Sequence, residues 1–491
     1  MDHTGTIGES KTGERHYSNF YPIRHPPEKR YDGFMDERTE KDLLGEKPIP
    51  ASAYWGIHTL RAVENFPLSG RRVAMELVRA FALVKKACCQ ANRDLKHLSP
   101  EKAAAIEQAC DEMVSGQWAD QFPVDALQGG AGTSTNMNVN EVLANRALEI
   151  LGQPKGAYEI VHPIEHVNLH QSTNDAYPTA LKIAAILGLR NLSAEIALLQ
   201  GAFQRKEKEF AEIVKIGRTE WQEAVPMTLG AEFSAFAEAL ARDRWRTFKC
   251  EERLRVINLG GTAIGTGLTA PRRFIFLANE KIREITRLGL TRAENMVDAT
   301  ANADCYVEVS GMLTACACNL LKISRDLRFL HALGEIHLPS MQAGSSIMPG
   351  KINPVILEAV MSAAIAVKSE GIAIADAASL GSLQINEFLP VIADALLDSL
   401  RLLRQAARIL APHIDGITAN AEECLRRANE SPMLITAFIP RIGYEKAQDL
   451  VREFQQNSSG SFRDFLVQRL GAQLVDEILS PLHLTRLGYP T

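Results

Sequence analysis

Residues 305–330 read CYVEVSGMLTACACNLLKISRDLRFL, and this stretch determines the fold that we expect. Its apolar side chains recur at alternating steps of four and three residues, which is a heptad spacing. The members of this stripe are Val309, Leu313, Cys316, Leu320, Ile323, Leu327 and Leu330. A stripe of this kind faces a second helix that crosses at a shallow angle. The segment therefore predicts one long helix of a helical bundle.

Four further stretches have the same character, at residues 177–214, 227–257, 354–380 and 390–409. Each is as long as, or longer than, an ordinary globular helix. Together the five segments predict a mainly all-α fold built on a rod-like five-helix bundle. The small residues Ala363, Ala364 and Ala366 permit close helix approach, and such rods bury further apolar surface by associating with copies of themselves.

The composition excludes several classes of function. The chain has 491 residues and is 46% hydrophobic, which suits a large core in two or three domains. Its 54 basic and 59 acidic residues leave a net charge of -5, so the whole molecule does not attract nucleic acid or anionic membrane. Local groups must capture any anionic substrate.

The sequence gives no sign of export. It has no run of eighteen apolar residues, and its first twenty residues have no apolar signal core, so we expect a cytoplasmic protein. The eight cysteines form no CxxC pair, which favours reduced thiols over zinc ligands or a disulfide framework. Residues 1–41 show no steady apolar period and predict an irregular arm.

Residues 344–354 read GSSIMPGKINP and carry the strongest chemical signal. Gly344 and Gly350 allow backbone conformations that other residues avoid, and the two prolines restrict the chain. Lys351 and Asn353 are two residues apart, so both can reach one anionic group. The alternative is a loop that only turns the chain.

This stretch resembles the signature of the aspartase/fumarase superfamily, GSSxMPxKxNP, and fills every fixed position. Four segments also resemble the aspartase branch in the same order, at residues 42–66, 128–145, 166–179 and 217–230. The resemblance implies a domain at 42–171, a central bundle at 172–415 that carries the signature loop, and a small helical domain at 416–491. It also implies a homotetramer with a twenty-helix core, in which three subunits build each active site.

Family members eliminate ammonia, water or a substituted amine from a succinyl-type substrate, usually giving fumarate, and use no cofactor. The carbon acid loses its proton only if its carboxylate accepts the charge as an enediolate, which requires hydrogen-bond donors around the oxygens. The resemblance assigns the base to Ser345 and the donors to Thr133, Ser172, Thr173 and Ser346. Lys351 and Asn353 would hold the other carboxylate, while Asn174 and Thr219 would position the amino group.

Each of these assignments has a structural alternative. Ser345 and Thr133 are also suited to forming turns, and a free serine hydroxyl is a weak base unless amides or positive charge stabilise its oxyanion. Lys351 is also suited to a helix end. The run that begins at Ser172 is also a good helix N-cap, a role compatible with substrate contact.

Two departures from the family pattern concern the substrate. Glu220 follows the Gly-Arg-Thr stretch, where fumarases and some aspartases carry histidine and other aspartases carry glutamine. A carboxylate there repels an anionic substrate unless it is protonated, faces a cation or meets a positive substrate group. Glu358 would form a like-charge pair with it, unless Glu220 faces outward. In addition, residues 331–336 replace a longer family segment that contains GPRxG.

Two other patterns are weaker signals. His162, His166 and His170 recur every four residues and would line one helix face as metal ligands, but Pro163 and the loop that follows argue against metal. The glycine-rich residues 260–267 lack the lysine of a phosphate loop, which favours a connection between bundle helices. We therefore predict no metal site.

The leading hypothesis is a carbon-nitrogen lyase that eliminates ammonia from L-aspartate. The forms QSTND and QAGSS favour the aspartase branch over fumarases, which typically have QSSND and EPGSS. The alternatives are a fumarate hydratase, a lyase for an N-substituted aspartate, and a catalytically silent tetrameric paralogue.

Overall fold

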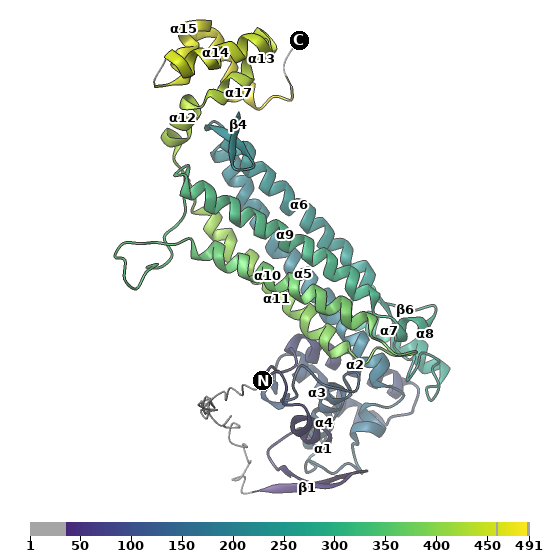
Figure 1. Ribbon diagram of the computed structural model, residues 1–491. Coiled ribbons are helices and arrows are strands. Elements are labelled where there is room, and N and C mark those ends of the chain that lie inside the picture. Colours follow the sequence, from purple (N-terminus) through teal and green to yellow (C-terminus); the bar gives the residue numbers. More distant parts are fainter. Residues whose placement is uncertain (1–35, 458–459, 489–491) are drawn as a thin grey trace, which may run out of the picture.

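The computed structural model describes residues 36–457 and 460–488. Five long helices form a rod, with a helical unit at each end (Figure 1). The rod helices are α5 (Thr173–Glu209), α6 (Leu229–Leu254), α9 (Asp304–Ala332), α10 (Val355–Ser379) and α11 (Leu389–Asp415). These helices overlap the five predicted segments, and the predicted mainly helical fold is confirmed.

The heptad stripe of α9 explains how the rod packs. All seven stripe residues, from Val309 to Leu330, are buried. Helix α9 packs against α6 and α10, while α11 packs against α5 and α10. Helix α5 is the one helix within residues 36–457 and 460–488 that is long and apolar enough to cross a membrane, and it lies between α6 and α11 in the bundle.

The N-terminal unit lies at the end of the rod where α5 begins (Figure 1). Strands β1 (Glu37–Asp42) and β2 (Gly45–Pro50) form an antiparallel hairpin. The helices are α1 (Ile57–Asn65), α2 (Met75–Asp94), α3 (Pro100–Val114), η1 (Ala119–Gln121), α4 (Thr133–Ile150) and the π-helix η2 (Pro163–Val167). Most of the predicted arm, residues 1–35, lies outside the described residues, and 37–41 lie in β1 rather than in an irregular segment.

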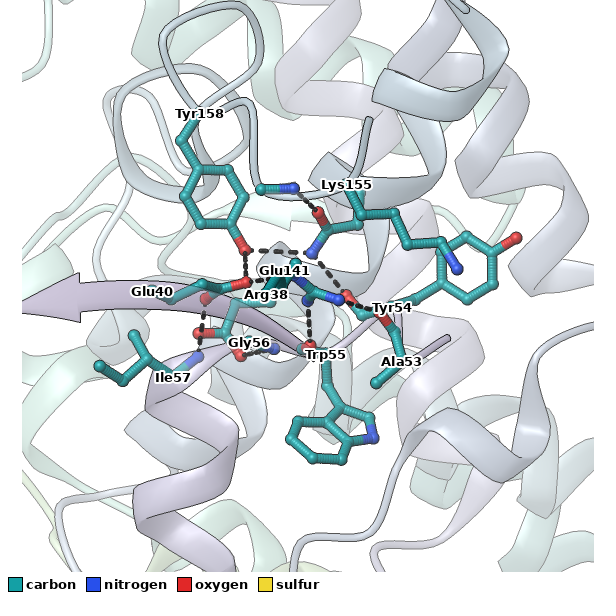
Figure 2. A network of polar contacts seen from close by, with 12 residues as sticks. Arg38, Glu40, Ala53, Tyr54, Trp55, Gly56, Ile57, Glu141, Lys155 and Tyr158 are labelled. Atoms are coloured by element: carbon teal, nitrogen blue, oxygen red, sulfur yellow. Dashed lines mark hydrogen bonds and ion pairs between the residues drawn. The ribbon is translucent and has the colours of Figure 1, made fainter. Parts of the chain in front are cut away.

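A buried polar network fixes the segment between β2 and α1 (Figure 2). Arg38 donates to the carbonyls of Ala53 and Trp55, each at 2.7 Å. From the other side, Glu141 of α4 accepts from the N–H of Gly56 at 2.8 Å. Burial raises the pKa of Glu141 to about 7. The network ties the first hairpin to α4, the helix that begins at Thr133.

Short elements connect the long helices. The hairpin β3 (Val214–Thr219) and β4 (Gln222–Thr228) joins α5 to α6, and β7 (Ile336–His337) pairs with β8 (Thr418–Ala419). Between α6 and α9 lie β5 (Val256–Ile257), α7 (Arg272–Thr286), β6 (Thr291–Arg292) and α8 (Met296–Ala301). The glycine-rich residues 260–267 thus connect α6 to α7.

The C-terminal unit has an apolar cluster of its own, which includes Phe438 and Phe462, whereas the bundle shares one continuous core with the N-terminal unit. The predicted boundaries near 171 and 416 remain predictions. The elements of this unit are α12 (Ala421–Glu430), η3 (Pro432–Phe438), α13 (Ile439–Ile442), α14 (Tyr444–Asn457), α15 (Phe462–Leu470), α16 (Ala472–Ile478) and α17 (Pro481–Leu484).

The junction of α4 and α5 depends on a glycine. Gly132 has a φ of +88°, and a Cβ atom there would lie 2.2 Å from Cδ2 of Tyr177. We expect Gly132→Ala to destabilise the protein by about 2–5 kcal/mol, because a left-handed backbone and overpacking add their costs. Thermal unfolding monitored by circular dichroism measures the effect.

Gly152 provides the matched control. Its φ is +71°, and nothing lies within 4 Å of the position that a Cβ atom would take. Gly152→Ala therefore tests the backbone cost alone, about 1–2 kcal/mol. Equal losses in the two variants would show that the contact with Tyr177 does not matter.

Candidate active site

The first group of predicted site residues lies where two helices begin. Thr133 is the first residue of α4, and Ser172 immediately precedes Thr173, the first residue of α5. Asn136 of α4 donates to Oγ1 of Thr173 at 3.1 Å, which joins the two helix starts. Helix N-termini carry unpaired N–H groups and partial positive charge, so this junction suits a carboxylate.

Ser172 forms the predicted helix cap. Its Oγ accepts from the N–H of Asn174 at 3.2 Å, and Oδ1 of Asp175 accepts from the N–H of Ser172 at 3.0 Å. This is a capping box. The cap uses the acceptor side of the Ser172 hydroxyl and leaves its O–H as a donor, so capping and substrate contact remain compatible.

Asp175 also binds the glycine-rich connection to this helix start. Its Oδ2 accepts from the N–H groups of Gly260 and Thr262 at 3.1 and 2.9 Å. Asn174 reaches the same segment, with Nδ2 donating to the carbonyl of Ala263 at 2.7 Å. Burial raises the pKa of Asp175 to about 6, although the three backbone donors act to lower it. Residues 260–267 thus lie against the candidate site.

Pro178 shapes the first turns of α5. A proline has no N–H, so it makes no helical hydrogen bond to the carbonyl four residues earlier, which is that of Asn174. That carbonyl accepts instead from Nδ2 of Asn258 at 3.0 Å. Asn258 lies between β5 and the glycine-rich connection, and this bond is a second link between that segment and the start of α5.

Beneath the same junction lies a fully buried lysine, Lys85 of α2. Its ammonium donates to Oδ1 of Asn168 at 2.7 Å and to Oε1 of Gln171 at 3.0 Å. Asn136 donates to the same Asn168 oxygen at 3.2 Å. Burial lowers the pKa of Lys85 to about 8. The lysine holds the segment that leads into Ser172.

The signature loop is the second group, and it projects from the side of the rod just before α10 (Figure 1). The N–H of Gly344 donates to the carbonyl of Lys351 at 2.8 Å, and Nδ2 of Asn353 donates to the carbonyl of Gly344 at 2.8 Å. These bonds close the base of the loop. Ser346 and Lys351 are exposed at its surface.

Ser345 lies half-buried within this loop. Its Oγ accepts from the backbone N–H groups of Ile347 at 3.2 Å and Met348 at 2.8 Å. This is the geometry of a turn hydroxyl. It also supplies what a serine base needs, because two N–H donors aimed at Oγ stabilise the negative charge of an oxyanion.

The third group lies at the tip of the β3–β4 hairpin. Thr219 pairs with Gln222, so Glu220 and Trp221 form a two-residue turn in which both have positive φ, +50° and +68°. Trp221 packs edge-on against Phe329 of α9, with ring centroids 4.2 Å apart, and this contact holds the strained turn.

Glu220 is exposed, and two cations that line the same pocket are paired with other acids. Arg218 and Lys322 line the same pocket, where they pair with Glu335 and Asp326. Its predicted like-charge neighbour, Glu358, is bound to Arg328 at 3.2 Å, and the pair of Glu220 with Glu358 remains a prediction. The hairpin tip therefore presents an exposed carboxylate, and Arg325 lies over the adjacent Trp221 ring at 4.8 Å.

One chain does not bring the three groups together. Helix α5 has 37 residues and so spans about 55 Å. Thr133 and Ser172 lie at the end where it begins. The hairpin follows its other end, and the signature loop leaves the rod toward that same end (Figure 1). Within one chain the first group is therefore far from the other two.

The three histidines have protein partners. His162 Nδ1 accepts from the N–H groups of Ile164 and Glu165, and His162 N–H donates to Nδ1 of His166 at 2.7 Å. His170 contacts Asn92 at 2.8 Å. Within residues 36–457 and 460–488, no three His, Cys, Asp or Glu side chains gather as metal ligands.

The chain belongs to the lyase family, whose pattern matches residues 45–368. The aspartate ammonia-lyase of Pseudomonas aeruginosa is 48% identical over 432 residues, which cover 86% of this chain and 91% of the relative. The aspartate ammonia-lyase of Bacillus subtilis is 42% identical over 465 residues, which cover 93% and 98%. These relatives confirm the resemblance to the aspartase/fumarase superfamily and the prediction of a carbon-nitrogen lyase.

Solved structures agree with this assignment. The structure titled fumarate lyase:delta crystallin from Brucella melitensis bound to cobalt matches with a TM-score of 0.88 and 44% identity, covering 92% of this chain and all of that one. The class II fumarase from Schistosoma mansoni matches with a TM-score of 0.86 and 31% identity, covering 91% and 99%.

The residues that the sequence reasoning missed are those that hold the site in place. They are Lys85, Asn136, Asn168, Asp175 and Asn258. One signal was available: residues 136–140, NMNVN, place three asparagines within five residues of one predicted helix, and all three are buried. Buried amides require partners, so such a cluster indicates a polar network.

The depressed pKa of Lys85 gives a pH-dependent contribution to stability. Folding favours the neutral amine, whose pKa is about 8 in the native state against the ordinary 10.5. Between these values the unfolded chain binds more protons, so stability rises with pH. We expect the stability of the wild type relative to Lys85→Met to increase by about 3 kcal/mol from pH 7.5 to 10.5. Urea unfolding across this range measures the difference, and a constant difference would contradict the depressed pKa.

Proposed function

We propose that the protein eliminates ammonia from L-aspartate to give fumarate, that it acts in the cytoplasm, and that it uses no cofactor. The observation that carries the proposal is the 42–48% identity to bacterial aspartate ammonia-lyases over about nine-tenths of the chain. The intact signature at residues 344–354 supports it.

In the proposed reaction, Ser345 Oγ removes a proton from the carbon atom that does not carry the amino group and that bears one of the two carboxylates. The electron pair moves onto that carboxylate, which becomes an enediolate, and its return expels the amine and forms the double bond. The N–H groups of Ile347 and Met348 already point at Oγ. They favour the oxyanion form of Ser345, and exclusion of water by the loop would strengthen this effect.

The enediolate would lie at the joint start of α4 and α5. Thr133, Ser172 and Thr173 supply hydroxyl donors there, and Ser346 would arrive with the signature loop. Two helix N-termini add positive potential there. Lys351 and Asn353 would hold the second carboxylate. Lys351 is exposed and Asn353 is half-buried on the loop, which supports a role that begins when the loop closes over substrate.

Glu220 supports an amine as the leaving group. Its carboxylate is exposed beside Thr219, and Arg218 and Lys322 in the same pocket pair with other acids. A carboxylate favours an ammonium group over a neutral hydroxyl. Together with Asn174 and Thr219 it would orient the amino group of aspartate, or that of an N-substituted aspartate with a remaining N–H. Glu358, bound to Arg328, would lie behind this contact.

We further propose a homotetramer in which each site takes groups from three chains. The separation of the groups along the rod supports this arrangement. Large apolar side chains also stand exposed on its helices, as expected of surfaces that pack against copies. They include Leu198 at 63%, Trp245 at 63%, Phe248 at 61%, Ile365 at 57% and Ile372 at 66% exposure.

A substrate panel tests the function. Purified protein is incubated with L-aspartate, malate and N-substituted aspartates, and fumarate is followed by its ultraviolet absorbance. We expect turnover of aspartate. Turnover of malate alone would support the fumarate hydratase that the Schistosoma mansoni neighbour suggests. A preference for a substituted amine would support the N-substituted substrate, and inactivity on all substrates would support a silent paralogue.

Ser345→Ala tests the base. We expect it to lower kcat by at least about 100-fold, because general-base catalysis contributes about 10²- to 10⁴-fold, and to leave the size of the assembly unchanged. Steady-state kinetics and light scattering measure both. Near-normal turnover by Ser345→Ala would overturn the assignment.

Co-expression of two variants tests whether one active site takes residues from different chains. We expect Ser345→Ala and Ser172→Ala each to be nearly inactive, whereas a site that takes the two residues from different chains regains both in some hybrids. Random hybrids recover roughly a quarter of wild-type activity, since each residue comes from an intact chain half the time. No recovery in co-expressed protein of tetrameric size would mean that one chain supplies both serines.

A further inference from the structure

Glu335 is a buried carboxylate for which the proposed mechanism has no use. It lies between the end of α9 and strand β7, in the shortened link that precedes the signature loop, and its side chain is completely buried. Its Oε2 lies 2.8 Å from Nζ of Lys215, and its Oε1 lies 2.7 Å from Nη1 of Arg218. Both cations belong to β3, the strand that ends at Thr219.

A bulge in the hairpin lies beside this double contact. The register shifts between Ile216 and Arg218, where Gly217 of β3 alone faces two residues of β4, so the extra residue belongs to β4. Side chains three residues apart in a regular strand point to opposite faces, and a bulge bends the ladder and increases its twist between Lys215 and Arg218. Gly217 suits this close approach, because a Cβ atom there would lie 2.9 Å from the carbonyl oxygen of Val225.

Two other segments are bound to this group, one through Glu335 and one through Lys215. The carbonyl of Glu335 accepts from the N–H of Asn420 at 2.9 Å, at the start of the C-terminal unit. Lys215 also binds Glu232 of α6 at 2.6 Å, so two carboxylates balance the two cations. Removing one member of such a buried group leaves an unpaired charge and moves its partners.

We propose that Glu335 is a positioning residue that sets the orientation of the β3–β4 hairpin, and with it Thr219 and Glu220, relative to the base of the signature loop. The chain passes from Glu335 through β7 directly into that loop. The effect on catalysis rests on the proposed function. The effect on the hairpin rests on the ion pairs and the bulge alone.

Glu335→Gln tests the proposal, since it keeps the shape and removes the charge. We expect kcat/KM for aspartate to fall by about 10- to 100-fold in a folded protein of unchanged size, because a displacement of about 1 Å in a positioning group has effects of this order. The emission of Trp221, obtained as the difference between each protein and its Trp221→Phe counterpart, shifts as the turn moves.

Glu251→Gln is the matched control. Glu251 is also buried and also binds two arginines, Arg190 at 2.7 Å and Arg255 at 2.8 Å, but it lies on α6 away from the hairpin. We expect it to lower thermal stability and to leave kcat/KM and Trp221 emission unchanged. An equal loss of kcat/KM in both variants would show that Glu335 is only a structural charge.

Two further variants keep the test decisive if Glu335→Gln does not fold. Arg218→Gln breaks only one contact and should shift the same emission. Glu335→Asp keeps the charge but is too short for both cations, and it should lower kcat/KM as well. Unchanged emission and kcat/KM in these variants overturn the proposal. If the wild type does not act on aspartate, the proposed function fails, and the Trp221 emission still decides the role of Glu335.

Discussion

One buried carboxylate, that of Asp175, organises the end of the molecule where chemistry is expected. It closes the capping box of α5 and also binds the N–H groups of Gly260 and Thr262. The longest helix of the rod, the loop before it and the glycine-rich connection therefore share one anchor. A carboxylate with three backbone donors tolerates burial, whereas an unpaired one does not. The positions of Ser172, Thr173 and Asn174 follow from it.

The fold was largely readable from the sequence because its signals are local and repeated. The stripe from Val309 to Leu330 needs only heptad spacing, and every member is buried. The capping role of Ser172 was equally local. The signature at 344–354 could be recognised as a string, and the structure adds that the Ser345 hydroxyl faces two backbone donors. The sequence pattern alone did not show whether backbone N–H groups stabilise the oxyanion of Ser345.

The rest depends on contacts between distant segments, which no local pattern encodes. Lys85 meets Asn168 across 83 residues, and Asn258, which follows β5, donates to the carbonyl of Asn174 that Pro178 leaves free in α5. In the sequence, Glu335 is only one residue of the shortened link before the signature loop. In the structure its side chain pairs with Lys215 and Arg218 of β3. The bulge in β4 opposite Gly217 escapes a reading based on alternation, because the extra residue breaks the period on which that reading relies.

The length of α5 has a consequence for how the enzyme would lose activity. In the proposed tetramer, residues about 55 Å apart along one chain would share a site only through neighbouring chains. Each folded chain would then be inert by itself, and dissociation into intact protomers would abolish turnover before any helix melts. Specific activity would fall on dilution while the circular dichroism spectrum stays constant, and association would set the working concentration range of the protein.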